Sequence, residues 1–167
     1  MVRRRLYTSL YASLLFTVLG LVAWATGQAF VFPSLGPSAF ILAFDRRGER
    51  TRTYRVVGSH VVGAAAGLLA YTLFAQGIAI TASPPPFSEA GLRLAAAGVL
   101  SIALTSWGMI ATDTNHAPAC ATTLIVSLGL LSTPVAVATI VLAVVILVEV
   151  HWLTISLTDR VRNRLEG

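Results

Sequence analysis

The sequence predicts an all-α membrane protein in which six segments cross the membrane as a 3+3 inverted repeat. Of its 167 residues, 56% are hydrophobic and only 11% are charged, and the mean hydropathy is +0.78. Its apolar runs approach or exceed the roughly 20 residues that a helix needs to cross a bilayer, whereas a barrel strand needs about ten. We therefore expect a single transmembrane domain over residues 1–167 rather than a soluble domain.

The first half of the domain, about 6–80, contains a long, a short and a long apolar segment. The first run extends from Leu6 to Thr26. The second, 27–44, is interrupted by three helix-breaking residues, Pro33, Gly36 and Pro37. We expect this span to be broken, with an extended stretch followed by half a helix. The third run, Val56 to about Ile80, contains GAAAG, a small-xxx-small pattern that allows helices to approach closely.

The second half, about 90–158, repeats this order. A fourth run, about Ala90 to Ala111, ends at the polar stretch TDTNHAP, residues 112–118. A short apolar stretch, Ala119 to Leu131, follows, and a long run from Val135 to about Leu157 closes the domain. We expect the polar stretch to be extended and the next helix to begin near its final proline, which makes a second broken span.

The basic residues, all of which are arginine, predict the topology. Apart from Arg93, they lie before the first run, in one polar loop and after the last run: Arg3, Arg4, Arg5, Arg46, Arg47, Arg50, Arg52, Arg55, Arg160, Arg162 and Arg164. Cytoplasmic segments carry such an excess, so both termini and the 45–55 loop should be cytoplasmic in a multi-pass protein of the cell membrane. Each short stretch must then cross the membrane. Nothing in these loops indicates nucleic-acid binding.

The two halves can be aligned on their broken spans. Placing Pro37 on Pro118 aligns GPSAFILAF with APACATTLI, and the long runs on either side come into register. The first half begins in the cytoplasm and the second begins outside, so the repeat would be inverted. Short segments interrupted by Gly or Pro at matching positions of two halves are typical of transport sites.

Three stretches together resemble the HPP family of integral membrane proteins, named for a His-Pro-Pro motif: FPSLGPSAFILAFDRR, VVGSHVVGAAAGLLAY and NHAPACATTLIVSLG. The resemblance covers about Phe32 to about Pro134, and it places the motif on His116, Ala117 and Pro118, with alanine in place of the first proline. It implies four transmembrane helices, which agrees with six crossings if the two short segments are not counted. Some members resemble nitrite transporters, so the resemblance suggests nitrite as the substrate.

The two half-helices would begin near the bilayer midplane with their N-termini facing each other. Free amides and a partial positive charge at each N-terminus favour an anion between them. We therefore predict a substrate site formed by the residues around the two helix starts: Gly36, Pro37, Ser38, Ala39, His116, Ala117, Pro118, Ala119 and Cys120. A simpler interpretation, in which both stretches are proline-kinked helices packed on their neighbours, stays open.

Four ionisable residues are candidates for proton coupling. His116 can exchange a proton near neutral pH, and Asp113 is the acid nearest to it in the sequence. Alternatively, His116 is neutral and holds the break open through a backbone carbonyl, and Asp113 caps a helix or lies in water. His60 has a packing or a vestibule role, and Glu149 either couples protons or pairs with His60 or an arginine.

The predicted function is transport of a small inorganic anion, through a channel or a proton-coupled carrier, without catalysis, a cofactor or a metal. A structural or accessory membrane subunit is the main alternative. An intramembrane enzyme or metal site at Asp113, His116 and Cys120 is a weaker one, because scattered ligands do not make a metal site. Besides the anion and membrane lipid, the expected partner is a second copy of the chain, since one short protomer encloses little space and small-residue faces allow packing.

Overall fold

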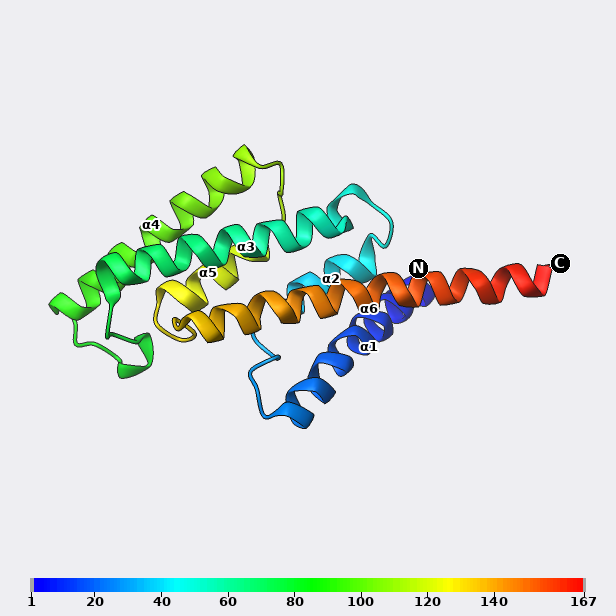
Figure 1. Ribbon diagram of the computed structural model, residues 1–167, viewed down its shortest axis with the longest axis horizontal. Coiled ribbons are helices and arrows are strands. Elements are labelled where there is room, and N and C mark those ends of the chain that lie inside the picture. Colours follow the sequence, from blue (N-terminus) through cyan, green and yellow to red (C-terminus); the bar gives the residue numbers. More distant parts are fainter. Residues whose placement is uncertain (1, 167) are drawn as a thin grey trace.

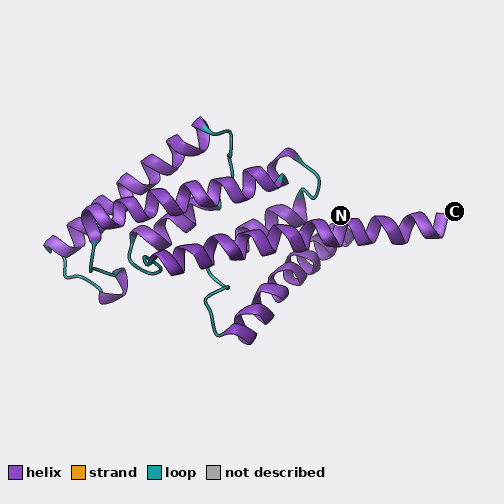
Figure 2. Cartoon of the chain, in the orientation of Figure 1, coloured by secondary structure: helices purple, strands orange, loops and turns teal. Residues whose placement is uncertain are grey.

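The computed structural model describes residues 2–166, and this part of the chain is helical without a β-strand. The α-helices are arranged as shown in Figure 1: α1 Val2–Thr26, α2 Leu35–Phe44, α3 Thr53–Ala70, α4 Glu89–Ala111, α5 Ala119–Ser127 and α6 Pro134–Glu166. A π-helical turn, Tyr71–Ala75, continues α3. Short 3-10 turns, Glu49–Thr51 and Ile80–Ala82, lie in the connections, which are otherwise loops (Figure 2).

Four helices are long and apolar enough to cross a membrane, namely α1, α3 with its π-helical turn, α4 and α6. The helices α2 and α5, with ten and nine residues, are too short to cross a bilayer as helices alone. The all-helical fold is therefore confirmed, and each half has a long, a short and a long helix. Helix α6 continues beyond the apolar run that reaches about Leu157, and its polar C-terminal part remains helical to Glu166 outside the bundle (Figure 1).

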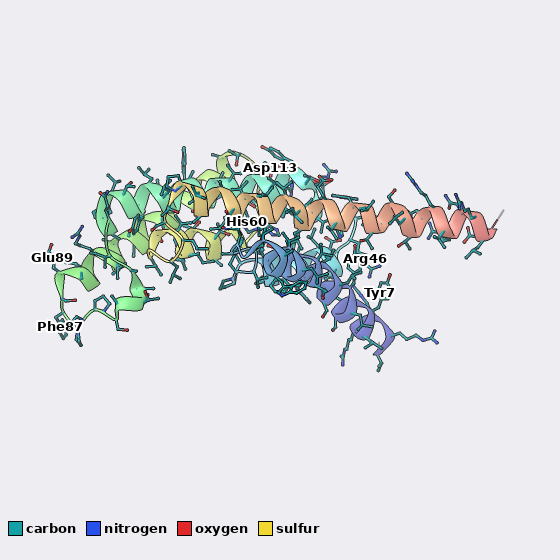
Figure 3. The ribbon with its side chains drawn as sticks, turned by 60° about the horizontal axis from the view of Figure 1, so that its bottom comes forward. Tyr7, Arg46, His60, Phe87, Glu89 and Asp113 are labelled. Atoms are coloured by element: carbon teal, nitrogen blue, oxygen red, sulfur yellow. The ribbon has the colours of Figure 1, made fainter. Side chains whose placement is uncertain are left out.

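Consecutive helices run in alternating directions along the long axis of the molecule (Figure 1). The helices α1, α3 and α5 run one way, and α2, α4 and α6 run the other way. Both ends of the described chain and the 45–52 loop lie toward one end of the molecule. Figure 3 shows Phe87 and Glu89 at the opposite end, and His60 lies between these residues and Arg46.

The helix α3 is the centre of the bundle and packs against α4, α5 and α6, while α1 packs against α2 and α6. The glycines of α3 lie directly on α5. A Cβ atom added at Gly63 would lie 2.6 Å from Thr123 Oγ1 and 2.8 Å from the carbonyl oxygen of Ala119, and one at Gly67 would lie 2.7 Å from the carbonyl oxygen of Thr123. The small-residue stretch thus allows the close approach that the sequence predicts, with α5 as the partner.

The largest apolar core lies where α1, α2 and α6 meet, and it includes the fully buried side chains of Leu15, Leu19, Leu42, Val144 and Leu147. Large apolar side chains also cover the outside of the bundle, among them Trp24, Val99, Trp107, Ile110 and Val135. Extensive exposed apolar surface of this kind is unfavourable in water but suits contact with lipid.

Candidate functional site

The two short helices begin close to the positions that the sequence predicts. Helix α2 begins at Leu35, two residues before the predicted start at Pro37, and Ser34 is its N-cap residue. Proline at the third helical position breaks no hydrogen bond, because the first four amides of a helix have no partner within it. Helix α5 begins at Ala119, directly after Pro118, whose φ of −55° is already helical.

The first turns of α2 and α5 touch each other. The hydroxyl of Thr122, on the first turn of α5, donates a hydrogen bond to Ser34 Oγ at 2.8 Å. From this point α2 runs toward the end of the molecule that carries the 45–52 loop, and α5 runs toward the opposite end (Figure 1). The N-termini of two short helices therefore lie together in the interior, and their helix axes point away from each other.

Two histidines enter this contact from other elements. His60 comes from α3, with Nδ1 2.8 Å from Thr122 Oγ1 and Nε2 3.1 Å from Ser38 Oγ. His116 comes from the loop between α4 and α5, with Nε2 3.0 Å from Ser38 Oγ. The centroids of the two imidazole rings are 5.5 Å apart. We call the five side chains the polar junction: Ser34, Ser38, His60, His116 and Thr122, each at most 2% exposed.

The loop that carries His116 is fixed to the N-terminal part of α3. Arg55 forms a salt bridge with Asp113 at 3.0 Å, and the Tyr54 hydroxyl donates to the carbonyl oxygen of Thr112 at 2.6 Å. Thr114 packs so closely on Gly58 that a Cβ atom there would lie 2.8 Å from the threonine methyl. These contacts hold the loop, and with it His116, in position next to His60.

The predicted anion-site residues divide between the interior and the surface. Buried are Ser38, Ala39, His116, Pro118 and Ala119, whereas Gly36, Pro37 and Ala117 are exposed and Cys120 is half-buried. The expectation of free amides at the start of α5 is wrong. The amides of Ala119, Cys120 and Ala121 bond to the carbonyls of His116, Ala117 and Pro118, because the residues before the helix are already wound into a turn. The available donors are therefore side chains.

The four candidates for proton coupling also lie in different parts of the structure. His60 and His116 lie together in the polar junction. Asp113 is exposed and paired with Arg55, so it is not the acid beside His116 that the sequence suggested. Glu149 lies on the exposed side of α6 and forms no ion pair within the described residues. It does not pair with His60, whose two nitrogens bond to Ser38 and Thr122.

The three residues of the suggested metal or enzyme site do not form one site, because each has different neighbours. Asp113 binds Arg55, His116 binds Ser38, and the Cys120 thiol belongs to α5. Across residues 2–166, no three His, Cys, Asp or Glu side chains are arranged so that they could hold a metal ion.

Two members of the polar junction, Ser34 and Thr122, were missed from the sequence. Each is a hydroxyl residue within one turn of a predicted helix start. That position was the only available signal, because the contact joins residues that lie 88 positions apart.

The third histidine belongs to a separate cluster at the end of the bundle that carries Arg46 (Figure 3). His151 Nδ1 lies 3.1 Å from the hydroxyl of Tyr11, and its Nε2 lies 3.0 Å from the carbonyl oxygen of Arg46. The guanidinium of Arg46 lies over the rings of Tyr7 and Tyr11, 4.0 and 4.3 Å from their centroids. This cluster connects α1, α6 and the loop after α2.

Residues 1–163 match the family model described as "HPP, transmembrane region". None of the curated proteins and none of the solved structures matches the chain.

Proposed function

The chain belongs to the HPP transmembrane family, and from this premise we propose that it transports a small inorganic anion, with nitrite as the first candidate. It is an integral membrane protein with four long apolar helices. The observation that carries the proposal is the contact between the first turns of α2 and α5, 2.8 Å from hydroxyl to hydroxyl. Each helix N-terminus carries roughly half a positive charge, so two of them at one place favour an anion.

Side-chain donors supply the hydrogen bonds for the anion. The hydroxyls of Ser34, Ser38 and Thr122 and the ring nitrogens of the two histidines converge at the polar junction. In the structure these side chains bond to one another. An anion enters by replacing some of these bonds, and because each donor then keeps a partner, the exchange leaves no buried polar group unpaired.

The packing of the helices supports the inverted repeat. An inverted repeat relates α1 to α4, α2 to α5 and α3 to α6. If the helices are exchanged in this way, each pair of helices in contact corresponds to another pair in contact. The contact of α1 with α2 becomes that of α4 with α5, the contact of α3 with α4 becomes that of α6 with α1, and the contact of α3 with α5 becomes that of α6 with α2. The contact of α3 with α6 is unchanged by the exchange. Such repeats commonly place the substrate at their interface.

We propose six crossings, with both termini and the 45–55 loop in the cytoplasm of a cell-membrane protein. Single cysteines at the exposed positions Arg3, Arg50 and Phe87, in a chain whose Cys120 is replaced by serine, test this arrangement. With six crossings, a membrane-impermeant maleimide should label Arg3→Cys and Arg50→Cys from the cytoplasmic side and Phe87→Cys from outside. If only the four long helices cross, Arg3→Cys and Arg50→Cys should react from opposite sides, which would contradict the inverted repeat.

The test of function is an uptake panel in proteoliposomes, with nitrite, nitrate, formate and chloride as the anions. We expect saturable, protein-dependent uptake of nitrite. Ser38→Ala removes the hydroxyl shared by both histidines and should lower uptake by about tenfold or more. Ser127→Ala is the matched control, because Ser127 is equally buried and bonded to Ser101 outside the polar junction. If no anion in the panel moves, the protein is a structural or accessory subunit.

We also propose that the protein works as a homo-oligomer. The exposed Glu149 lies within the apolar stretch of α6, where an acid facing lipid is energetically unfavourable. A second copy that covers this face of α6 would remove the carboxylate from lipid. Glu149→Cys should then form a disulfide-linked dimer under mild oxidation, and a chain that stays monomeric at every protein-to-lipid ratio would contradict this arrangement.

A further inference from the structure

We propose that the polar junction is a proton relay: a continuous hydrogen-bonded chain, His116–Ser38–His60–Thr122–Ser34, passes one proton per transport cycle between the 112–118 and 27–34 loops. The coupling of this proton to an anion rests on the function proposed above, but proton movement itself can be measured separately. The relay gives Ser34 and Thr122, two of the donors of the proposed anion site, a second role, so proton uptake and anion uptake are measured separately for each variant.

The hydrogen-bond geometry assigns a direction to the chain. Thr122 donates its only hydroxyl hydrogen to Ser34, so it must accept a hydrogen from Nδ1 of His60. A neutral His60 with its hydrogen on Nδ1 has a free lone pair on Nε2, which accepts from Ser38 when the Ser38 hydroxyl hydrogen turns from the carbonyl oxygen of Ser34 toward His60. Ser38 in turn accepts from Nε2 of His116. Every donor in the chain therefore points from His116 toward Ser34.

A chain in which all donors point one way can transfer a proton without separating charge over a long distance. A proton binds His116 Nδ1, the Nε2 proton of His116 moves to Ser38 Oγ, and the Ser38 hydroxyl proton moves to His60 Nε2. The Nδ1 proton of His60 then moves to Thr122 Oγ1, the Thr122 proton moves to Ser34 Oγ, and the original Ser34 hydroxyl proton passes to the anion bound at the polar junction, because Ser34 itself is fully buried. One proton enters and one leaves, and every residue ends neutral.

Ser38 also allows the proton to pause in the middle of the chain. Its hydroxyl lies 3.1 Å from the carbonyl oxygen of Ser34 as well as 3.1 Å from His60 Nε2. When the hydroxyl hydrogen rotates to the carbonyl, both lone pairs of Ser38 can accept from the two histidines. His60 can then carry hydrogens on both nitrogens, as an imidazolium with all its bonds made. This charge lies beside two helix N-termini, where an anion compensates it.

The two ends of the chain lie on loops that reach the polar junction from opposite sides of the bundle in the view of Figure 1. His116 follows α4, whose C-terminal end lies beside the N-terminal part of α3 and Arg55. Ser34 closes the 27–34 loop, which returns from the far end of α1 (Figure 1). Nδ1 of His116 forms no hydrogen bond within residues 2–166, so this nitrogen is the start of the chain and can take up a proton.

The other ionisable groups near the chain are already engaged or separate from it. Arg55, five residues before His60 on α3, is paired with Glu49 and Asp113. His151 and Tyr11 bond to each other in the second cluster. The half-buried Cys120 lies on the first turn of α5, and Glu149 is exposed on α6. His60 and His116 are thus the groups through which a proton enters and crosses the junction.

After one transfer every hydrogen bond in the chain is reversed. The hydroxyls must rotate and the imidazole rings must turn before a second proton can follow the same path. A relay that has to be reset moves one proton per cycle, which suits a coupled carrier better than an open channel.

The test compares two adjacent, equally buried threonines in proteoliposomes that contain a pH-sensitive dye. Thr122→Val keeps the shape of the side chain but interrupts the relay, and it should lower proton uptake during an imposed inward nitrite gradient by about 100-fold. Thr122→Ser restores the hydroxyl and should restore proton uptake. Thr123→Val removes a hydroxyl bonded to Thr105, outside the relay, and should behave like the unmodified protein. Protein-free vesicles correct for diffusion of the undissociated acid.

The outcomes separate the relay from the transport function. Anion uptake without proton uptake by the unmodified protein, or unchanged proton uptake by a folded Thr122→Val variant, would overturn the relay and leave anion transport standing. A second measurement imposes a membrane potential without an anion gradient. Proton uptake that Thr122→Val abolishes, while no anion of the panel moves, would reject anion transport and overturn the anion as the acceptor of the proton. If Thr122→Val does not fold, Ser38→Ala interrupts the same chain. Because Ser38 also belongs to the anion site, the measurement is then the ratio of proton uptake to anion uptake, and an unchanged ratio would overturn the relay.

Discussion

Replacing His116 with glutamine (His116→Gln) should leave the protein folded and remove the acceleration of anion uptake by an inward proton gradient. A glutamine amide can still bond to Ser38 Oγ, which His116 Nε2 approaches to 3.0 Å, so the contact between the loop and α2 persists. An amide does not gain or lose a proton in the physiological range, whereas an imidazole does. The measurement is uptake at equal and at unequal pH across the proteoliposome membrane, together with the melting temperature in detergent.

The third histidine provides the control for this substitution. His151 is as buried as His116 but bonds to Tyr11 and to the backbone of Arg46, away from the polar junction. His151→Gln should therefore retain the effect of the proton gradient. If His116→Gln and the unmodified protein respond equally to the gradient, His116 has no part in proton coupling. If His116→Gln loses stability first, its role is that of a structural clamp.

A single methyl group at Gly63 should have the largest effect on the architecture. The added carbon of Gly63→Ala would lie 2.8 Å from the carbonyl oxygen of Ala119, at the start of α5. A backbone atom cannot move aside as a flexible side chain can, so α5 must shift away from α3. Such overpacking costs about 1–3 kcal/mol of stability. The same shift separates Thr122 from His60, which are 2.8 Å apart, so transport should fall together with stability.

Gly20 on α1 is the matched position, because a Cβ atom added there meets nothing within 4 Å. Gly20→Ala should leave both properties unchanged or raise stability slightly, since alanine favours the helix. Thermal unfolding in detergent and nitrite uptake measure the two effects. If Gly63→Ala is as stable as Gly20→Ala, the backbone of α5 is free to move and the close contact of α3 with α5 is not required.

Local chain chemistry made several elements predictable. Proline lacks an amide hydrogen and restricts the residue before it, so Pro37 and Pro118 indicated the starts of two short helices to within two residues. The length of the apolar runs indicated the four long helices. The GAAAG stretch indicated a close helix contact, because the absence of large side chains is visible without knowing the partner.

The partners of individual side chains were not predictable in the same way. Asp113 is three residues from His116 in the sequence, but its carboxylate pairs with Arg55, 58 residues away, because α3 and the loop after α4 lie side by side. The amides at the start of α5 are bonded because the preceding residues form a turn, which the sequence does not specify. Glu149 is exposed because of how α6 is rotated in the bundle, and a nearly uniform apolar helix carries no signal for that rotation.

By itself, the sequence determined that this protein is helical, where its helices lie and that two of them are short, because these properties depend on apolar run length and on proline and glycine. Only the tertiary structure decided that Ser34, Ser38, His60, His116 and Thr122 form one hydrogen-bonded chain. These residues come from three helices and two loops, and a hydrogen bond depends on distances of about 3 Å that no one-dimensional pattern contains. The packing of α5 on the glycines of α3 sets those distances.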